Sequence, residues 1–273
     1  MTLLKVLLDA TKAVKELVQE NLDKASDYTG NQNRYGDKTL VLDIKAEEEI
    51  IRIIRESGVT FNFLTEEQGY FELSDSPEYL AIIDPIDGSS NLERNIQLCS
   101  SGICIVPFSK SLTTDDAEIS VVASIFSRET FVAVKGKGVT KNGKQVQTSK
   151  LKQLKDAIIS YDTNQLWNRE FTNSSNRVLR AVKDIRRTAS NLLDLCWTAS
   201  GSLEAMVDMR GVLPIVHLSG THMVFEAGGY VIDNNGNRLC LPIDIDSRMV
   251  FIAAADERLA TAIYEIFMGK KRK

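Results

Sequence analysis

The first twenty residues of the chain place apolar side chains at the spacing of a helix, with charged residues between them. The apolar positions that share one face are Leu3, Leu7, Ala10, Val14, Leu17 and Val18. This pattern predicts a helix that runs to about residue 25. Residues 26–37 are polar and contain two glycines, which predicts a loop. Asp43 can then act as the N-cap of a second helix over residues 44–56.

Further along, short apolar runs typical of strands replace the helical spacing. Residues 61–64 and 79–83 each predict a buried strand. Between residues 98 and 134, β-branched and aromatic residues predict three strands of a meander, and Asn142-Gly143 predicts a hairpin turn after it. The first half of the chain is therefore expected to combine two helices with an antiparallel sheet.

Residues after about 150 mix strands and helices without regular alternation. The pattern predicts a strand over 157–161, a long helix over 189–207, and helices over 219–227 and 257–268. No doubly wound nucleotide-binding unit is indicated, so the predicted fold class is α/β of the mixed α+β kind.

The composition is typical of a globular protein, and it limits the classes of partner that the chain is expected to bind. Of its 273 residues, 43% are hydrophobic and 26% are charged, and the net charge of −4 provides no general attraction to nucleic acid or to an anionic membrane. No apolar run is long enough to predict a membrane span. The four cysteines lack CxxC spacing and lie mainly among apolar neighbours, which favours reduced thiols in a cytoplasmic protein.

The stretch IDPIDGSSN, residues 83–91, follows the apolar run at 79–83 directly. This order predicts a buried strand that ends in a turn and presents Asp84 and Asp87 side by side. Two such carboxylates repel each other at neutral pH unless cations lie between them, and carboxylate oxygens are the ligands that Mg²⁺ prefers. The alternative is an ordinary turn, because Asp-Pro and Asp-Gly pairs also form turns.

Other acidic residues stand where they could join the two aspartates. Glu66 and Glu67 end a predicted strand, and Asp43 begins a predicted helix, while Ser89 follows Asp87 closely enough to orient a water. Together they suggest a carboxylate cluster around a metal pair that activates water and neutralises a phosphoryl group. Taken singly, the glutamates could be solvated, and Asp43 could serve only as a helix cap.

On these residues the chain resembles the inositol monophosphatase superfamily, closest to its archaeal inositol monophosphatase/fructose-1,6-bisphosphatase branch. The motifs that carry the resemblance are IDPIDGSSN, the preceding TEE, EAGG at 226–229, GDKTLVLD at 36–43, VKGKGVTKNGKQVQTS at 134–149 and RRTASNLLDLCWTASGSLEAMVD at 186–208. The resemblance implies a sugar-phosphatase layered α-β-α-β-α architecture. It also implies a Mg²⁺-dependent phosphomonoesterase that hydrolyses inositol 1-phosphate, fructose 1,6-bisphosphate or both, and a homodimer.

The resemblance also assigns roles to single residues. It makes Glu66, Asp84 and the carbonyl of Ile86 ligands of a first Mg²⁺, with Asp84 shared with a second Mg²⁺ at Asp87. Glu66 and Ser89 would position and activate the attacking water, with Asp43 in support. Residues 1–150 would then form an α+β half with most metal ligands, and residues 151–273 an α/β half packed with it as one compact unit.

A further set of residues is implied to bind the substrate, a small phosphorylated molecule. They are Asp87, Gly88, Ser89, Ser90, Ala189, Ser190, Asp208, Arg186 and Arg187. The backbone N–H groups at 88–90 would hold phosphate at a helix N-terminus. Either arginine could meet a second phosphate or sugar oxygens, and a surface salt bridge is the alternative for both.

One departure from the family pattern concerns the second metal. The family carries another metal-binding Asp about ten residues before the Glu of EAGG, and this chain places Val216 or His217 there, depending on the direction of counting. Mg²⁺ is a poor partner for imidazole, so His217 could instead recruit Mn²⁺ or Zn²⁺, bind phosphate as a cation, or have no role. The missing Asp keeps open one rival, a pseudo-phosphatase that only binds its ligand. A second rival is a 3′-phosphoadenosine nucleotide phosphatase, as in a related branch of the superfamily, although no feature of the sequence selects an adenosine pocket.

Overall fold

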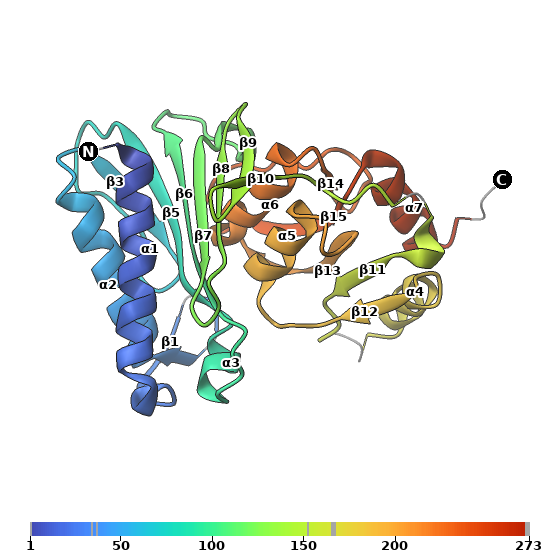
Figure 1. Ribbon diagram of the computed structural model, residues 1–273, viewed down its shortest axis with the longest axis horizontal. Helices are drawn as coiled ribbons and strands as arrows, with labels where there is room; N and C mark the ends of the chain where they lie inside the picture. The colour runs from blue at the N-terminus through green and yellow to red at the C-terminus, as the bar shows by residue number, and fades with distance from the viewer. Residues whose placement is uncertain (1, 34, 37, 152, 165–167, 271–273) are drawn as a thin grey trace.

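A computed structural model describes residues 2–33, 35–36, 38–151, 153–164 and 168–270. Five layers alternate helices and sheets, as Figure 1 shows. Two helices cover the outer face of an eight-stranded sheet, two helices lie between it and a five-stranded sheet, and two helices pack beyond the second sheet. This arrangement confirms the predicted α-β-α-β-α architecture. Within the described residues, no helix has both the length and the apolar character needed to cross a membrane.

The outer helices are α1 (Leu3–Glu20) and α2 (Val41–Arg55), with a short 3-10 turn, η1 (Leu22–Lys24), after the first. Between them, β1 (Tyr28–Gln32) pairs antiparallel with β2 (Lys38–Leu40). The prediction of a loop over residues 26–37 was therefore wrong for β1. Every residue of β1 is exposed, so this strand buries no face and carries no alternation of apolar and polar residues that could reveal it.

The large sheet has the strand order β10-β9-β8-β7-β6-β5-β3-β4, which confirms the predicted meander and hairpin. Its strands are β3 (Phe61–Thr65), β4 (Gly69–Phe71), β5 (Tyr79–Asp87), β6 (Ser100–Pro107), β7 (Ile119–Ser124), β8 (Thr130–Val134), β9 (Gly138–Lys141) and β10 (Lys144–Val146). A short helix, α3 (Ser89–Glu93), follows β5, and the 3-10 turn η2 (Thr114–Asp116) precedes β7. β5 runs four residues beyond the predicted end at 83, and its register against β6 shifts between Asp84 and Asp87.

The smaller sheet has the order β12-β11-β13-β15-β14. Its strands are β11 (Ile158–Tyr161), β12 (Asp184–Arg186), β13 (Ala205–Pro214), β14 (Tyr230–Ile232) and β15 (Arg248–Ala254), the last of which the sequence pattern did not predict. The helices are α4 (Arg169–Leu179), α5 (Asn191–Ala199), α6 (Leu218–Glu226) and α7 (Glu257–Phe267), with 3-10 turns η3 (Leu154–Asp156) and η4 (Ile215–His217).

The prediction of a long helix over residues 189–207 was wrong for the second half of that range. α5 ends at Ala199, Gly201 adopts a positive φ of 76°, and the chain then enters β13 at Ala205. A glycine in this left-handed conformation is a common way to end a helix. The apolar residues after it continue the buried face of a strand, which periodicity over so short a run does not distinguish from a helix.

One apolar core joins the two sheets through the helices between them. Leu64 and Val122 of the large sheet, Leu192 of α5, Met223 of α6 and Phe251 of the small sheet belong to the same buried cluster. The strands of each sheet come from one side of residue 150. Each part also has an apolar cluster of its own, one within residues 6–125 and one within residues 154–264. The division into residues 1–150 and 151–273 stays a prediction.

Candidate active site

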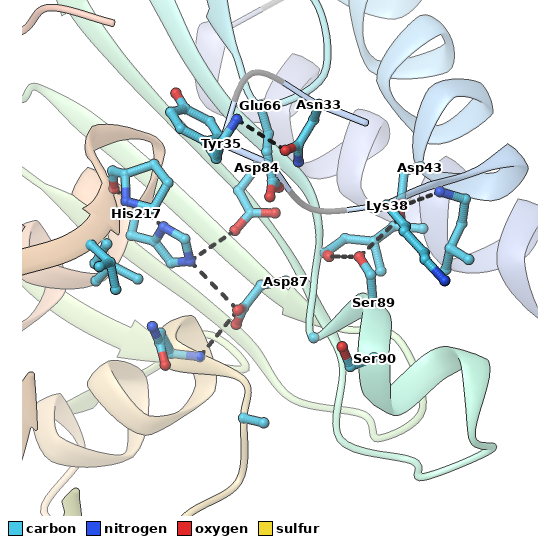
Figure 2. A pocket seen from close by; sticks show the side chains of 18 of the residues that line it. Asn33, Tyr35, Lys38, Asp43, Glu66, Asp84, Asp87, Ser89, Ser90 and His217 are labelled. Carbon is cyan, nitrogen blue, oxygen red and sulfur yellow. Dashed lines mark hydrogen bonds and ion pairs between the residues drawn. The ribbon is translucent and has the colours of Figure 1, made fainter. Parts of the chain in front are cut away.

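A cavity of about 780 Å³ opens where β5 ends, and residues from both parts of the chain line it. Figure 2 shows Glu66, Asp84, Asp87 and Ser89 directed toward one another across it. The residues predicted for the site that line this cavity are Asp43, Glu66, Asp84, Ile86, Asp87, Gly88, Ser89, Ser90, Arg187, Ala189 and His217. The structure thus brings most of the predicted set together.

Asp84 is fully buried, and among the described residues no hydrogen bond reaches either of its carboxylate oxygens. Burial, together with the charges of Asp87 and Glu67, raises the pKa of Asp84 to about 7, although His217 acts in the opposite direction. A buried carboxylate without donors is costly to keep ionised unless a cation pairs with it. The surroundings of Asp84 therefore fit a divalent metal ion.

Asp87 is also buried, yet four groups donate hydrogen bonds to it. Ser190 Oγ lies 2.6 Å and Ser100 Oγ 3.2 Å from Asp87 Oδ2. The backbone N–H groups of Asn191 and Leu192, in the first turn of α5, donate at 3.1 and 2.8 Å. Asp87 thus satisfies two N–H groups that the helix itself leaves without partners. It thus links α5, in the helix layer between the two sheets, to β5 of the large sheet.

Asp43 is not the N-cap as predicted, because α2 begins at Val41, three residues before the predicted start at 44; Leu40 is the N-cap, and Asp43 helps to cap the helix as its third residue. Its Oδ2 accepts a hydrogen bond from the backbone N–H of Leu40 at 3.0 Å, and its Oδ1 lies 3.1 Å from Ser89 Oγ. The same hydroxyl lies 2.9 Å from the carbonyl of Ile86. Burial and the charge of Glu67 raise the pKa of Asp43 to about 8. A hydroxyl paired with such a basic carboxylate can accept a proton from a water.

Glu66 stands at the end of β3, beside Asp84, which lies on the adjacent strand β5. Desolvation, followed by the charges of Asp84, Glu67 and Asp43, raises the pKa of Glu66 well above its usual value. So many carboxylates in one cavity raise one another's pKa because each disfavours the charge of the next. Glu66, Asp84 and the Ile86 carbonyl form an all-oxygen set of the kind that suits Mg²⁺.

Sequence reasoning missed Glu47, which positions the turn that carries Glu66. Glu47 is fully buried on α2, and its carboxylate accepts hydrogen bonds from the backbone N–H groups of Glu67 and Gln68 at 3.0 and 3.2 Å. A glutamate within the helical run 44–56 shows no sign of this contact, because its partners lie twenty residues away in another element.

The structure decides between the two residues considered for the missing family aspartate. Val216 is fully buried in the apolar core. His217 Nε2 lies 3.3 Å from Asp84 Oδ2 and 3.6 Å from Asp87 Oδ1, so His217 occupies the place beside the two aspartates (Figure 2). Burial lowers the pKa of His217, but the hydrogen bond and charge of Asp87 and the charge of Asp84 outweigh it and raise the pKa to about 9.

Two residues at the cavity floor have unusual backbones. Gly88 has a φ of 93°, and a Cβ atom there would lie 2.9 Å from the carbonyl oxygen of Leu98 and 3.3 Å from that of Ala189. Only glycine fits this position without a shift of the backbone. Ala189 itself has a φ of 59°, a left-handed conformation that costs energy for an alanine. Strain of this kind is common next to functional sites.

The remaining predicted residues lie in different surroundings. Arg186 pairs with Asp184 at 2.7 Å on the surface and is absent from the cavity wall, whereas Arg187 lines the cavity and lies 3.4 Å from Asp162. Ser190 is buried behind the wall, where it donates to Asp87. Asp208 is fully buried and bonds Arg210.

Arg210 is a second residue that the sequence analysis missed, and unlike Glu47 it lines the cavity. Its guanidinium is almost fully buried and lies 2.5 Å from Asp208 Oδ2 and 2.8 Å from Asp162 Oδ2. It also donates to Asn164 Oδ1 at 2.6 Å. The segment DMRG, residues 208–211, could have indicated this contact, because it places an acidic and a basic residue close together next to an apolar run. A buried arginine needs a carboxylate partner. Arg210, Asp162 and Asn164 all line the cavity.

Comparison with known proteins agrees with this site. The profile of the Inositol monophosphatase family matches residues 1–268. The chain belongs to the inositol monophosphatase family. The structure of a Thermotoga maritima IMPase shares the fold, with a TM-score of 0.81, 22% identity, and coverage of 99% of this chain and 98% of that one.

Two relatives of the family are named as phosphatases. A fructose-1,6-bisphosphatase/inositol-1-monophosphatase of Thermococcus kodakarensis is 28% identical and covers 96% of this chain and 95% of its own length. A bifunctional NADP phosphatase/NAD kinase of Methanococcus maripaludis is 27% identical over 98% of this chain. This chain spans about half, 49%, of the length of the Methanococcus protein. Membership of the inositol monophosphatase family and these relatives support a phosphatase function.

Proposed function

We propose that this protein is a Mg²⁺-dependent phosphomonoesterase that hydrolyses a small polyol or sugar phosphate, either inositol 1-phosphate or fructose 1,6-bisphosphate. The observation that carries this proposal is the buried carboxylate of Asp84, which shares a polar cavity with Glu66 and whose charge is met among the described residues only by the ion pair with His217 Nε2 at 3.3 Å. A group of this kind is stable as an anion only beside a cation. Membership of the inositol monophosphatase family supports the same chemistry.

The residues fit divalent metal ions, because the carboxylates of Glu66, Asp84 and Asp87 and the carbonyl of Ile86 line the same cavity. Glu66, Asp84 and the Ile86 carbonyl would hold the first ion, and Asp84 with Asp87 would hold the second. When bound, the ions lower the pKa of a water and neutralise the charge of the phosphoryl group. The chain's own residues then have to position this water and move its proton.

Ser89 and Asp43 are arranged to move that proton. When the Ser89 hydroxyl donates to Asp43 Oδ1, its oxygen keeps a lone pair that can accept a hydrogen from the attacking water. Glu66 lies in the same cavity and can accept from this water on its other side. The backbone N–H groups of residues 88–90 would orient the phosphate, which requires the positive φ of Gly88.

The test is phosphate release by the purified protein with Mg²⁺, Mn²⁺ or Zn²⁺ in turn. The substrates are inositol 1-phosphate, fructose 1,6-bisphosphate, 3′-phosphoadenosine 5′-phosphate and NADP, the last because of the name of the Methanococcus relative. We expect release from the sugar or polyol phosphates. Release from the adenosine nucleotide alone would favour the nucleotide phosphatase instead.

A matched pair of serine variants shows whether the reaction uses this site. Ser89→Ala is expected to lower kcat by roughly 10²-fold, the usual contribution of a positioned proton-transfer group. Ser109→Ala serves as the control, because Ser109 is exposed and does not line the cavity. A folded protein that binds the sugar phosphates but releases no phosphate with any metal would be a pseudo-phosphatase, and the proposal would be wrong. The cytoplasmic location and the homodimer stay predictions.

A further inference from the structure

The side chain of His217 is buried between the two aspartates of β5 and comes from a different part of the chain. It stands in the 3-10 turn η4, directly after β13, and its Nε2 approaches Asp84 Oδ2 to 3.3 Å and Asp87 Oδ1 to 3.6 Å. These three ligand atoms lie within 4.8 Å of one another, close enough to share one ion. The second site of the proposed metal pair therefore contains an imidazole in place of a third carboxylate.

The other ring nitrogen of His217 has a partner that orients the imidazole. Nδ1 lies 3.3 Å from the carbonyl oxygen of Pro214. A carbonyl only accepts hydrogen bonds, so Nδ1 carries the hydrogen in this contact, and a neutral ring then directs the lone pair of Nε2 toward Asp84 and Asp87. Histidines that bind metals almost always donate their second N–H to a carbonyl or carboxylate in this way.

The spacing of the ligand atoms favours a small tetrahedral ion over Mg²⁺. Bonds of about 2.0–2.1 Å in a tetrahedral Zn²⁺ site separate neighbouring ligand atoms by roughly 3.3 Å. The same bond lengths in the octahedral shell of Mg²⁺ separate them by roughly 2.9 Å. The observed separations of 3.3 and 3.6 Å lie nearer the tetrahedral value. Imidazole nitrogen is moreover a ligand that Zn²⁺ accepts and Mg²⁺ avoids.

We propose that Asp84, Asp87 and His217 bind Zn²⁺ in place of the second Mg²⁺, so that the protein carries a mixed metal pair. Glu66, Asp84 and the Ile86 carbonyl keep the all-oxygen site for Mg²⁺, and Asp84 belongs to both sites. The inference rests on the proposed function only in taking the carboxylate cluster as a metal site. Metal binding without substrate is therefore the appropriate measurement.

The experiment is equilibrium dialysis of the metal-stripped full-length protein against Zn²⁺ in a large excess of Mg²⁺, with the bound metals counted per chain. We expect one Zn²⁺ per chain for the wild type. His217→Asp is expected to bind Zn²⁺ roughly 100-fold more weakly and Mg²⁺ more strongly, because it replaces the nitrogen ligand by a carboxylate. Circular dichroism and thermal melting check that the variant is folded.

His222 provides the matched control, because it is the other of the two histidines in the chain. It is buried against Ser120 at 2.8 Å and does not line the cavity, so His222→Asn is expected to leave Zn²⁺ binding unchanged. Co²⁺ offers a second readout that does not depend on affinity. The wild type should show the intense visible absorption of a tetrahedral Co²⁺ site, and His217→Asp should lose it.

Two results would overturn the inference. The first is Zn²⁺ binding that is no weaker in folded His217→Asp than in the wild type. The second is a wild type that binds no Zn²⁺, in which case the protonated imidazole itself bridges the two aspartates. Phosphate release bears on a separate question. Zn²⁺ bound through His217 without turnover with any metal supports the metal site and contradicts the phosphatase proposal, whereas turnover with Mg²⁺ by a protein that binds no Zn²⁺ does the reverse.

Discussion

Asp84 and Asp87 lie on the same strand, three residues apart, yet the two carboxylates have opposite surroundings. Asp84 receives no hydrogen bond within the described residues, and the nearest cationic group is His217 Nε2 at 3.3 Å. Asp87 accepts hydrogen bonds from two serine hydroxyls and two backbone N–H groups. The difference suggests that Asp84 is kept for an ion, whereas Asp87 also holds the two sheet layers together.

This contrast shows how one motif can carry two kinds of function. The register shift of β5 against β6 falls between the two aspartates. Beyond that irregularity Asp87 lies against the first turn of α5, which offers its N–H groups. A helix N-terminus stabilises an anion through these unpaired donors and through its dipole. Asp87 therefore has four donors besides any metal, whereas Asp84 has only the ion pair with His217.

The largest expected effect is the loss of activity in Asp84→Asn. The amide keeps the shape of the side chain but removes the charge that two cations would share, so kcat/KM for the sugar phosphate is expected to fall roughly 10³-fold or more. The free energy of unfolding of the metal-free protein should fall less than in Asp87→Asn, because Asp84 loses only its ion pair with His217 and no other donor. Steady-state kinetics and urea unfolding measure the two effects, and a large loss of stability would contradict the comparison.

Asp87→Asn tests the other side of the comparison. The amide replaces one acceptor oxygen by a donor that faces the donors of Ser190, Asn191 and Leu192. We expect the metal-free protein to lose roughly 3 kcal/mol of unfolding free energy, as is usual when a buried charged partner is removed. If urea unfolding shows the same stability as for Asp84→Asn, the two carboxylates do not differ in the way proposed.

Asp194 of α5 is an intermediate case, because one of its buried oxygens accepts from Ser160 Oγ at 2.5 Å and the other has no partner among the described residues. Burial raises the pKa of Asp194 to about 7 from 3.8. The folded protein then binds this proton more tightly than the unfolded chain does, so stability falls as the pH rises from about 4 to 7.

The matching variant is Asp194→Asn, which has no proton to lose. Between pH 4 and pH 7 the wild type is expected to lose roughly 3 kcal/mol of unfolding free energy more than the variant does. Urea unfolding at a series of pH values measures the difference between the two slopes. Parallel curves for the two proteins would show that Asp194 keeps an ordinary pKa.

Ala189→Gly gives the smallest effect and concerns the turn that presents Ser190 and α5 to Asp87. A left-handed φ of 59° is unfavourable for alanine but not for glycine. The free energy of unfolding of the variant should therefore rise by roughly 1 kcal/mol. Ala199→Gly is the control, because Ala199 lies in the last turn of α5 and glycine there should destabilise the protein. A loss of stability in both variants would show that the turn at Ala189 is not strained.

The sequence predicted many of the helices and strands and most of the carboxylates, because these depend on local order, whereas the layers were predicted from the family resemblance. The apolar run at 79–83 and the motif after it place Asp84 and Asp87 at a strand end without knowledge of any distant residue. Prediction of secondary structure from the sequence failed where the local pattern of residues carries little information. The exposed strand β1 has no buried face, and the run after Gly201 was read as helix although it forms a strand.

What the sequence alone determined is the chemistry that the site can hold: a family motif, its acidic ligands and the absence of the expected aspartate. Tertiary structure alone decided that His217, and not Val216, stands beside Asp84 and Asp87, that Glu47 holds the turn after Glu66, and that Arg210 joins the cavity wall. The physical reason is that each of these contacts joins residues far apart in the chain. Only the packing of β13, α2 and α5 against the end of β5 determines which side chains meet there.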